Sequence, residues 1–268
     1  MARYIVTGTE GFIGKAVLEA LQLRGDYVWQ IHQDKNTWED ELALESMVKQ
    51  CDGIFHIGAI SDTTEQDPNY MLYWNYTTSK KLFDLARKYD KNVVYSSSAA
   101  CYGDGDGIPK NIYGWSKLLA EEYGLRTCEK FVALRYFNVY GPGEEHKGKM
   151  ASVAFQAWKA GKFKLFPKKP KRDFVYIADI VHANLHAMTI QRGVFDVGTG
   201  KAESFESLVE GMEISYTFHS DDKIPKWYQS FTQADKTKFM PGWKPYWNIK
   251  SGTQDYKEVL ENEDISSR

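Results

Sequence analysis

The sequence predicts an α/β fold: a doubly wound parallel sheet with helices on both faces, accompanied by a smaller second domain. Short, apolar, β-rich segments recur through the first half of the chain, at 4–7, 27–31, 53–57, 92–96 and 131–135. Stretches with apolar residues at helical spacing lie between them, at 12–24, 70–89 and 113–128. Strand and helix therefore alternate, as a parallel sheet with crossover helices requires.

The regular alternation ends near residue 142, and this predicts how the chain divides into domains. We expect a first domain over 1–142 and a smaller one mainly over 143–268. Short apolar segments return at 174–177 and 194–197, so strands from 174–200 are expected to join the sheet of the first domain. The two domains are therefore expected to be interleaved.

Composition and charge exclude several classes of protein for this chain of 268 residues, which is long enough to bury an enzyme-sized core. A net charge of -2 provides no basic field for nucleic acid or an anionic membrane, and the basic run 168–172 is typical of a loop beside an anionic ligand. No apolar run approaches a membrane span of roughly 20 residues and the first residues do not resemble a signal peptide, so a cytoplasmic protein is expected. Cys51, Cys101 and Cys128 form no CxxC pair, which favours buried thiols over disulfides or a metal site.

A glycine-rich turn follows the first apolar segment. The sequence GTEGFIG occupies residues 8–14, and the helical pattern begins at once. In such a loop Gly8 permits a tight turn, Gly11 lets the backbone approach a phosphate, and Gly14 allows the helix to pack closely on the sheet. The spacing is GxxGxxG, and its place between strand and helix predicts a Rossmann-like dinucleotide site. We therefore expect the first domain to bind a dinucleotide and the second to bind a substrate.

The end of the second strand predicts which dinucleotide binds. Folds selective for NAD usually place an acid there, which hydrogen-bonds the ribose 2′-hydroxyl. This chain has His32 and Gln33 at that place, followed by Asp34 and Lys35. Without the acid a 2′-phosphate is not repelled, and Lys35 or a protonated His32 could attract it. The sequence therefore favours NADP, with NAD as the alternative.

A serine strand end, a tyrosine and a lysine predict acid/base chemistry. The serines at 96–98 close a β-rich segment, and Tyr113 and Lys117 stand four residues apart in the next helical stretch. That spacing places both on one helix face, where the ammonium of Lys117 is expected to lower the pKa of Tyr113 from about 10 toward neutrality. Tyr113 would exchange a proton with a substrate hydroxyl while a serine hydroxyl binds the reacting oxygen.

Longer motifs resemble one enzyme family across nearly the whole chain. They are TGxxGFIG at 7–14, the serine stretch 96–103, the YxxxK pair at 113–117 and RYFNVYGP at 135–142. Together they resemble the extended short-chain dehydrogenase/reductases. Within that family the chain looks most like the ADP-L-glycero-D-manno-heptose 6-epimerases, on the segments 145–155, 171–176, 198–205 and 231–235.

The resemblance implies roles for individual residues. Tyr113 and Lys147 would be two acid/base residues, assisted by Ser98 and Lys117. With the glycine loop and the second strand end, the expected cofactor contacts are Gly8, Gly11, Phe12, Ile13, Gly14, His32, Gln33, Gly58, Ala59, Asn75, Lys117 and Val139. The expected substrate contacts are Ser98, Asn138, Lys149, Gln156, Arg172 and Tyr228. Lys149 and Gln156 replace a serine and a histidine of the family pattern, which puts the sugar or nucleotide specificity in question.

The implied reaction is epimerisation of an ADP-heptose through a ketone at C6, with hydride passing to and from a nicotinamide. Reduction on the opposite face leaves the oxygen in a different place, so a second proton donor is needed, and Lys147 would be that group. The resemblance also implies a homo-oligomer.

Two alternatives stay open. The first is a 4-epimerase, dehydratase or reductase acting on another nucleotide sugar. A dehydratase usually has an Asp-Glu pair after the serine or threonine of the catalytic strand, where this chain has Ala99 and Ala100. The second is a catalytically idle regulator that binds the cofactor, against which the intact set of Ser98, Tyr113 and Lys117 speaks.

Overall fold

The computed structural model describes residues 1–167, 170–220 and 231–266. These residues belong to two compact units, of which the first comprises 1–136 and 181–196 and the second 137–180 and 197–268. No helix in the described ranges is long and apolar enough to cross a membrane. All three cysteines are buried and form no disulfide, as expected.

The first unit is built around a sheet whose strand order is β2-β1-β3-β4-β5-β9. Its strands are β1 (Arg3–Thr7), β2 (Tyr27–Ile31), β3 (Gly53–His56), β4 (Asn92–Ser98), β5 (Phe131–Tyr136) and β9 (Arg192–Val197). The pairings from β2 through β5 are parallel, with Thr7 opposite Ile31 and His56 opposite Tyr95. The predicted fold class, a Rossmann-like doubly wound sheet, is therefore confirmed.

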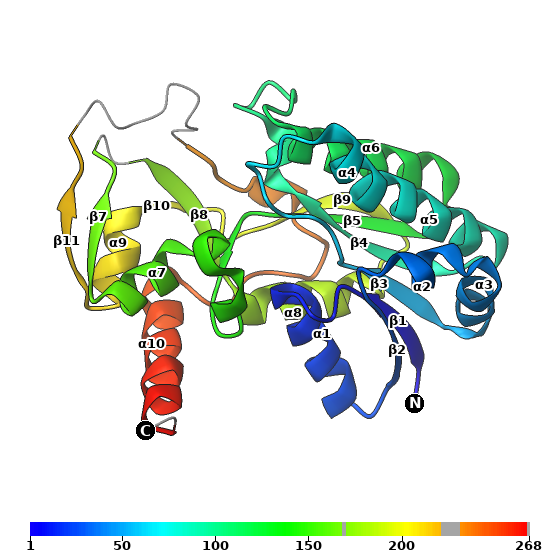
Figure 1. Cartoon of the computed structure of the whole chain (residues 1–268), viewed down its shortest axis with the longest axis horizontal. Helices are drawn as coiled ribbons and strands as arrows, with labels where there is room; N and C mark the ends of the chain where they lie inside the picture. The colour runs from blue at the N-terminus through cyan, green and yellow to red at the C-terminus, as the bar shows by residue number, and fades with distance from the viewer. Residues whose placement is uncertain (168–169, 221–230, 267–268) are drawn as a thin grey trace. The chain divides into compact units, whose positions relative to one another are not determined.

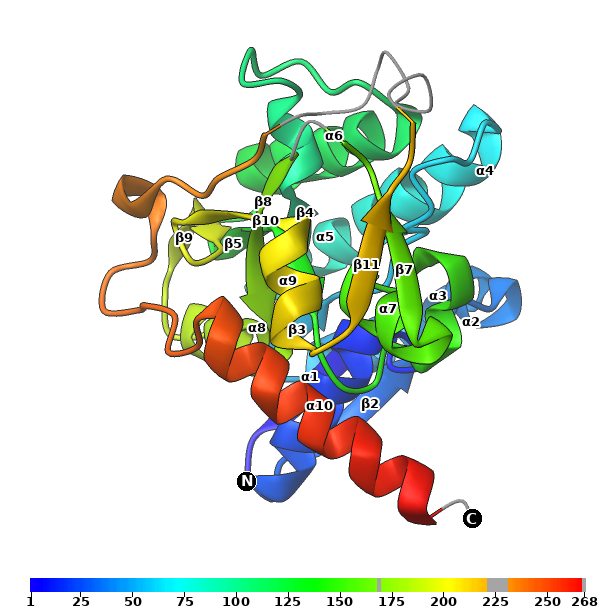
Figure 2. The same ribbon diagram turned by 90° about the vertical axis from the view of Figure 1, so that its left-hand side faces the viewer.

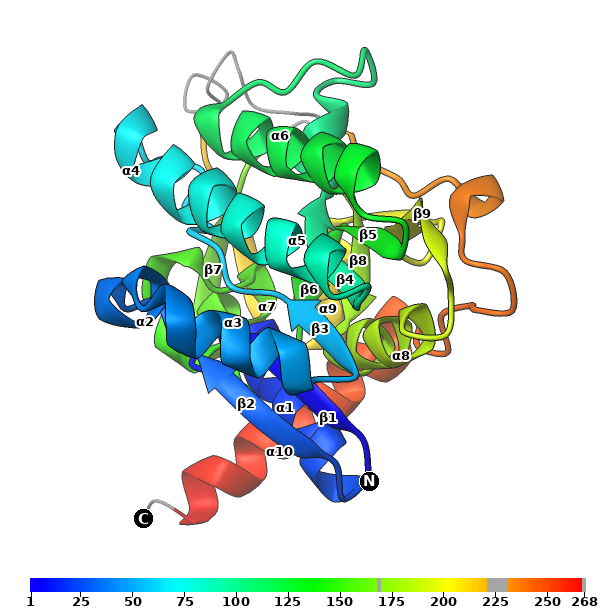
Figure 3. The ribbon, with the colours of Figure 1, turned by 90° about the vertical axis from the view of Figure 1, so that its right-hand side faces the viewer.

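Helices cover both faces of this sheet (Figures 1 and 3). They are α1 (Phe12–Leu23), α2 (Lys35–Glu39), α3 (Glu41–Gln50), α4 (Pro68–Leu72), α5 (Thr78–Lys88), α6 (Ile112–Thr127) and α8 (Ile177–Ala187), of which α8 begins in the second unit. Figure 3 shows α3, α5 and α6 on one face and α1 and α8 on the other. Because both faces are covered, the interior strands read as continuous apolar runs rather than alternating ones.

The core beneath α3, α5 and α6 contains a cluster of aromatic rings. Phe83 of α5 packs edge-on against Phe131 of β5, with ring centroids 5.0 Å apart, and against Tyr95 of β4 at 5.5 Å. All three side chains are fully buried. Such edge-to-face pairs add to the stabilisation from buried area alone. This packing holds β4 and β5 rigidly, and β4 ends in the serines of the predicted site.

The helix predicted over 70–89 is interrupted. Asp67 caps α4 by accepting from the backbone N–H groups of Asn69 and Tyr70, and Pro68 occupies the first turn. The chain then widens into a π-helical turn, η1 (Tyr73–Thr77), before α5 begins. Single π turns often occur at functional sites because they redirect one side chain, and here that turn contains Asn75.

The second unit contains two small sheets, of order β10-β8-β6 and β11-β7. Their strands are β6 (Asn138–Tyr140), β7 (Lys162–Leu165), β8 (Lys171–Tyr176), β10 (Ala202–Ser204) and β11 (Ser215–Phe218). The helices are α7 (Val153–Ala160), α9 (Phe205–Gly211) and α10 (Ile249–Ser266), with short 3-10 turns η3 (Glu145–Met150) and η5 (Lys236–Lys238). In Figure 2, α9 lies between the two sheets. It packs on both, through Phe205 against Phe174 and through Val209 against Leu165.

The two later segments that were expected in the first sheet have different positions. Segment 194–197 lies in β9, next to β5. Segment 174–177 lies mostly in β8, which pairs with β6 and β10 in the second unit. An apolar pattern indicates a strand but carries no information about which sheet edge accepts it.

Candidate active site

The glycine loop makes a close-packed cradle at the start of α1. Gly8 has a φ of +71°, and a Cβ on it would lie 2.5 Å from the Cα of Gly58. A Cβ on Gly14 would lie 2.0 Å from the carbonyl oxygen of Gly8. No side chain fits at either position, so the loop stays tight and the first turn of α1 remains close to it. The amides and the positive dipole end of that turn favour an anion.

A buried hydroxyl in the same loop has no partner within the described residues. Thr9 is 5% exposed, and its Oγ1 makes no hydrogen bond there. Buried polar atoms are normally satisfied, so an orphaned hydroxyl in a glycine cradle points to a ligand oxygen. Phe12 is buried and Ile13 half-buried at the start of α1. The residues present therefore fit a dinucleotide pyrophosphate.

The second wall of the cradle follows β3. Gly58 donates its N–H to Oγ1 of Thr7 at 2.8 Å, which holds it against Gly8. Ala59 is half-buried beside it. The loop is then clamped by Asn75, whose Oδ1 accepts from the N–H of Ile60 at 2.7 Å and whose Nδ2 donates to the Ile60 carbonyl at 2.9 Å. Asn75 is one of the predicted cofactor contacts, and its amide holds this loop in place.

The end of β2 contains an interaction that sequence reasoning missed. Nδ1 of His32 lies 3.5 Å from Oε1 of Glu10. Glu10 belongs to the glycine loop and directly precedes Gly11. One sequence signal for this interaction was the acidic residue Glu10 within the glycine-rich motif, because the backbone around it is expected to face a phosphate.

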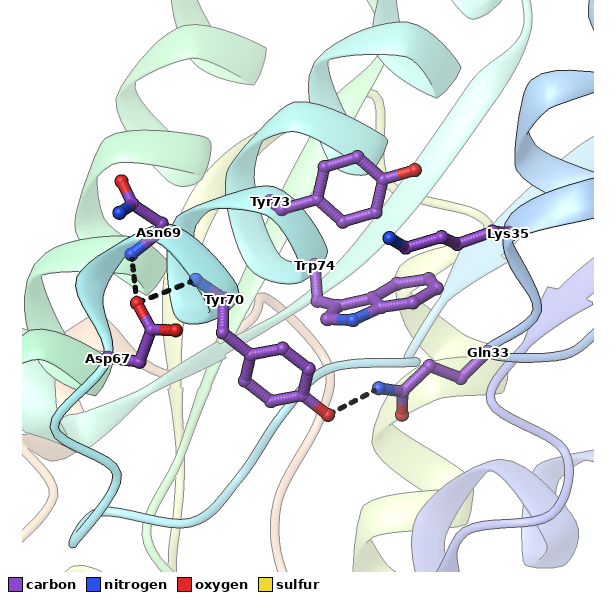
Figure 4. A pocket seen from close by; sticks show the side chains of 7 residues that line it. All are labelled: Gln33, Lys35, Asp67, Asn69, Tyr70, Tyr73 and Trp74. Carbon is purple, nitrogen blue, oxygen red and sulfur yellow. Dashed lines mark hydrogen bonds between the residues drawn. The ribbon is translucent and has the colours of Figure 1, made fainter.

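A pocket of about 590 Å³ opens beside this strand end, and Figure 4 shows it. It is lined by Gln33, Lys35, Asp67, Asn69, Tyr70, Tyr73 and Trp74. Nε2 of Gln33 donates to the Tyr70 hydroxyl at 3.3 Å. Nζ of Lys35 lies 5.5 Å from the ring centroid of Tyr73, a cation–π distance. The predicted residues Gln33 and Lys35 thus contribute to one pocket wall.

Ser98 and Tyr113 come together at the carboxyl end of β4. Ser98 ends the strand, and its Oγ accepts from the N–H of Ala100 at 3.1 Å. Tyr113 lies in the first turn of α6, whose cap Asn111 accepts from the N–H of Gly114 at 2.8 Å. Burial raises the pKa of Tyr113 to about 12, while a hydrogen bond with Ser98 opposes this rise. The pair can therefore hold and exchange a proton at the phenol oxygen.

Lys117 is 1% exposed, one helical turn beyond Tyr113. Its Nζ donates to Oγ of Ser96 at 3.5 Å and lies 4.4 Å from the ring centroid of Tyr95. Burial lowers the pKa of Lys117 to about 7, while electrostatic interactions with Cys101 and Glu121 act to raise it. The expectation that Lys117 brings the Tyr113 pKa toward neutrality is wrong for this arrangement. The ammonium contacts Ser96 and the Tyr95 ring, and the burial of Tyr113 dominates.

A buried ion pair beneath α6 was also missed. Glu121 is fully buried and accepts from Nε of Arg135 at 3.1 Å and from Oγ of Ser97 at 2.5 Å. The Arg135 guanidinium lies 4.4 Å from the ring centroid of Tyr102. Glu121 stands four residues after Lys117, so the same helical spacing that predicted the pair could have identified it. It ties α6, which carries Tyr113 and Lys117, to β4 and β5.

Lys147 belongs to the second unit, in the turn η3. Its side chain is half-buried, and burial lowers the pKa of Lys147 while the charge of Glu144 raises it. Glu144 is fully buried and accepts from Oγ of Ser152 at 2.6 Å and from the N–H of Gly141 at 3.3 Å. The turn that carries Lys147 is thus anchored to the N-cap of α7. An ammonium that loses its proton more easily than usual is suited to acid/base exchange.

The remaining predicted substrate residues lie in the same unit. Asn138 begins β6 and is exposed; opposite it stands Phe174 of β8, two residues after Arg172. Arg172 is buried, and its guanidinium lies 5.8 Å from the ring centroid of Phe205. Gln156 donates to the carbonyl of Ala151 at 2.7 Å. Of the other predicted contacts, Val139 is half-buried and Lys149 is exposed. Tyr228 lies outside the described residues, as do Lys168 and Lys169 of the basic run.

Asp173 does not need Arg172 as a partner. Its carboxylate accepts from the backbone N–H groups of Thr199 at 2.7 Å, Gly200 at 2.8 Å and Ala234 at 3.0 Å. Burial raises the pKa of Asp173 and these hydrogen bonds lower it. The sequence left a structural pairing of Arg172 with Asp173 as an alternative to binding a diphosphate. The carboxylate of Asp173 is held by backbone amides.

Known proteins resemble the chain over almost its full length. ADP-L-glycero-D-manno-heptose-6-epimerase of Helicobacter pylori is 29% identical, with 97% of this chain and 96% of that chain covered and a TM-score of 0.83. UDP-N-acetylglucosamine 4-epimerase of Methanobrevibacter ruminantium is 24% identical over 98% and 99% of the two chains, with a TM-score of 0.84. UDP-glucose 4-epimerase of Thermus thermophilus, solved as a complex with NAD, is 23% identical over 97% and 99%, with a TM-score of 0.78.

At these identities the last two similarities concern the fold alone. The family described as NAD dependent epimerase/dehydratase matches residues 4–198, which include the glycine loop, Ser98, Tyr113, Lys117 and Lys147. The chain belongs to the NAD-dependent epimerase/dehydratase family.

Proposed function

We propose that this enzyme is an ADP-glycero-manno-heptose 6-epimerase, which oxidises C6 to a ketone and reduces it again on the opposite face. Membership of its family makes it a pyridine-nucleotide-dependent enzyme of the sugar-nucleotide epimerase class. The observation that carries the narrower proposal is Lys147, a half-buried lysine with a lowered pKa in the segment that resembles the heptose epimerases. The 29% identity to the H. pylori enzyme supports it.

The chain's own residues account for cofactor binding. Gly8, Gly11 and the first turn of α1 would hold the pyrophosphate, with the Thr9 hydroxyl as a further partner. A nicotinamide bound there supplies the hydride acceptor and donor for a secondary alcohol. For the choice of dinucleotide, the absence of an acid directly after β2 supports NADP, whereas the carboxylate of Glu10 beside His32 favours NAD.

Tyr113 performs the first proton transfer. As the hydride leaves C6, Tyr113 in its deprotonated form takes the proton of the C6 hydroxyl, so the alcohol loses a hydride and a proton and becomes a ketone. Because burial raises the pKa of Tyr113 to about 12, this deprotonated form is the minority at neutral pH. Ser98 stabilises the phenolate by the hydrogen bond that already opposes the rise of its pKa. The N-terminus of α6 favours the same negative charge, because Tyr113 lies in its first turn.

Lys147 performs the second proton transfer. Once the ketone has turned about the bond to the ring, hydride returns to its other face and the oxygen points away from Tyr113. The ammonium of Lys147 then donates the proton that completes the new hydroxyl, and its lowered pKa makes that donation easier. Arg172 would bind the diphosphate of the substrate, since guanidinium groups bind phosphates bidentately.

Another nucleotide-sugar epimerase, dehydratase or reductase is the main competitor. The proposal is tested by incubating the purified enzyme with ADP-D-glycero-D-manno-heptose and separating the two C6 epimers, with UDP-glucose and UDP-N-acetylglucosamine as parallel substrates. We expect conversion toward an epimer mixture with the ADP-heptose alone. Turnover of a UDP-sugar with no change in the ADP-heptose would contradict the proposal and identify the enzyme as another nucleotide-sugar epimerase, dehydratase or reductase.

Replacing Lys117 by Met should slow turnover and weaken cofactor binding, each by about tenfold or more, because we assign its ammonium to the nicotinamide ribose and so to the placement of the nicotinamide beside the substrate. The stability of the folded protein should not decrease in this variant. The unfolded pKa lies near 10.5 and burial lowers the folded pKa to about 7, so at neutral pH the buried ammonium is unfavourable for folding and an apolar Met relieves it. Steady-state kinetics, fluorescence titration with the reduced cofactor and a thermal melt separate these effects.

Lys110→Met serves as the control for that variant, since Lys110 is exposed and pairs with Asp106 at 2.7 Å. It should leave kinetics and binding unchanged. If Lys117→Met keeps both turnover and cofactor affinity, the lysine is a packing residue only.

A further inference from the structure

The acid nearest the end of β2 in sequence makes three local hydrogen bonds. The Oδ2 of Asp34 accepts from the N–H of Thr37 at 3.0 Å and from its hydroxyl at 2.7 Å, and Oδ1 accepts from the N–H of Asn36 at 3.3 Å. Asp34 therefore caps α2. Its carboxylate is directed at the first turn of that helix.

Tertiary structure places a different carboxylate, that of Glu10, beside the end of β2. β1 and β2 are neighbours, and the N–H of Gly8 donates to the carbonyl of Ile31 at 2.9 Å, so the glycine loop lies beside the end of β2. From that loop Glu10 reaches His32, with 3.5 Å between Oε1 and Nδ1. The Glu10 side chain is 75% exposed and that of His32 is 44% exposed, so both are accessible to a ligand.

The cation that favoured NADP in the sequence has another contact. Nζ of Lys35 lies against the Tyr73 ring in the pocket shown in Figure 4. Glu10 and, when protonated, His32 thus form a pair of opposite charges at the strand end. A carboxylate accepts a hydrogen bond from a 2′-hydroxyl and repels a 2′-phosphate, which carries negative charge of its own.

We propose that Glu10 selects the cofactor: its carboxylate replaces the acid missing after β2 and makes the enzyme prefer NAD over NADP. The inference rests on the proposed function only in that the glycine loop binds a dinucleotide. It assigns selectivity to a residue of the loop that holds the pyrophosphate, not to the strand that usually reads the ribose.

The test is a pair of binding titrations of the purified full chain with NADH and NADPH, followed by nicotinamide fluorescence, for the natural protein and for Glu10→Gln and Glu10→Lys. The natural protein should bind NADH more tightly. Glu10→Gln should shift the ratio of the two dissociation constants toward NADPH by about tenfold, and Glu10→Lys by about a hundredfold, because one and then two unit charges change beside the phosphate. Glu19→Gln, an exposed acid on α1, should leave the ratio unchanged.

Tighter binding of NADPH by the natural protein, or an unchanged ratio in Glu10→Gln, would overturn the inference while leaving the dinucleotide site in place. Binding of neither cofactor by a protein with a cooperative thermal melt would instead overturn the proposed function, and the inference with it. Because Glu10 is largely exposed, both variants should fold, and their melts confirm this independently of binding.

Discussion

Tyr113→Phe is expected to lower turnover by about 100-fold or more while cofactor affinity stays nearly unchanged, because the phenol oxygen is the group that exchanges a proton with the substrate hydroxyl. The ring is kept, so packing at the start of α6 is preserved. The hydroxyl of Tyr113 hydrogen-bonds Ser98, and its loss removes that contact without leaving a buried charge. Turnover is measured by the appearance of the epimer, and cofactor affinity by fluorescence titration.

Tyr123→Phe is the matched control on the same helix. Its hydroxyl donates to Asp84 at 2.6 Å, away from the serines at the end of β4. This variant should lose some stability and keep its turnover. Native turnover in Tyr113→Phe would contradict the acid/base role, whereas equal losses in both variants would point to a general effect of losing a tyrosine hydroxyl from α6.

Lys147→Met should abolish epimerisation, with a loss of at least about 100-fold, because the second proton transfer then has no donor. The same variant should keep partial activity on a substrate mimic that carries an aldehyde in place of the C6 alcohol. On that mimic one molecule is oxidised while another is reduced, and each transfer needs only one correctly placed acid/base. Tyr113 can still serve the binding pose that points the oxygen toward it.

The two half-reactions make this prediction specific. Tyr113→Phe should behave in the complementary way on the aldehyde, and the double variant should be inactive on both substrates. Lys159→Met, an exposed lysine of α7, is the control and should epimerise normally. Native epimerisation by Lys147→Met would mean that Lys147 is a loop cation, and the enzyme would move to the one-base dehydrogenases and reductases.

The local order of the fold could be predicted because it depends on short-range chemistry. The segment 27–31 became β2 with the same bounds, and 12–24 became α1 with a difference of one residue. Apolar spacing and glycine placement act over a few residues, so they can be recognised without knowing the rest of the molecule. The same holds for the spacing of Tyr113 and Lys117 on one helix.

Long-range partners could not be predicted in the same way. Glu121 and Arg135 lie 14 residues apart, His32 meets Glu10 from another segment, and Asn75 clamps Ile60 across 15 residues. No periodicity in the sequence indicates these pairs, because they depend on which elements the sheet order makes neighbours. The break in the predicted helix 70–89 was unpredictable for the same reason. Its π turn contains Asn75, whose partner Ile60 lies in another segment.

By itself, the sequence determined the α/β alternation, the glycine cradle and the family, because each follows from residue types at fixed short spacing. The tertiary structure alone decided that β9 rather than β8 continues the first sheet, and that a carboxylate stands beside the end of β2. It also decided the direction in which the pKa of Tyr113 moves. The physical reason is that burial and charge proximity arise from packing between distant segments, and a side chain's proton affinity depends on those surroundings more than on its neighbours along the chain.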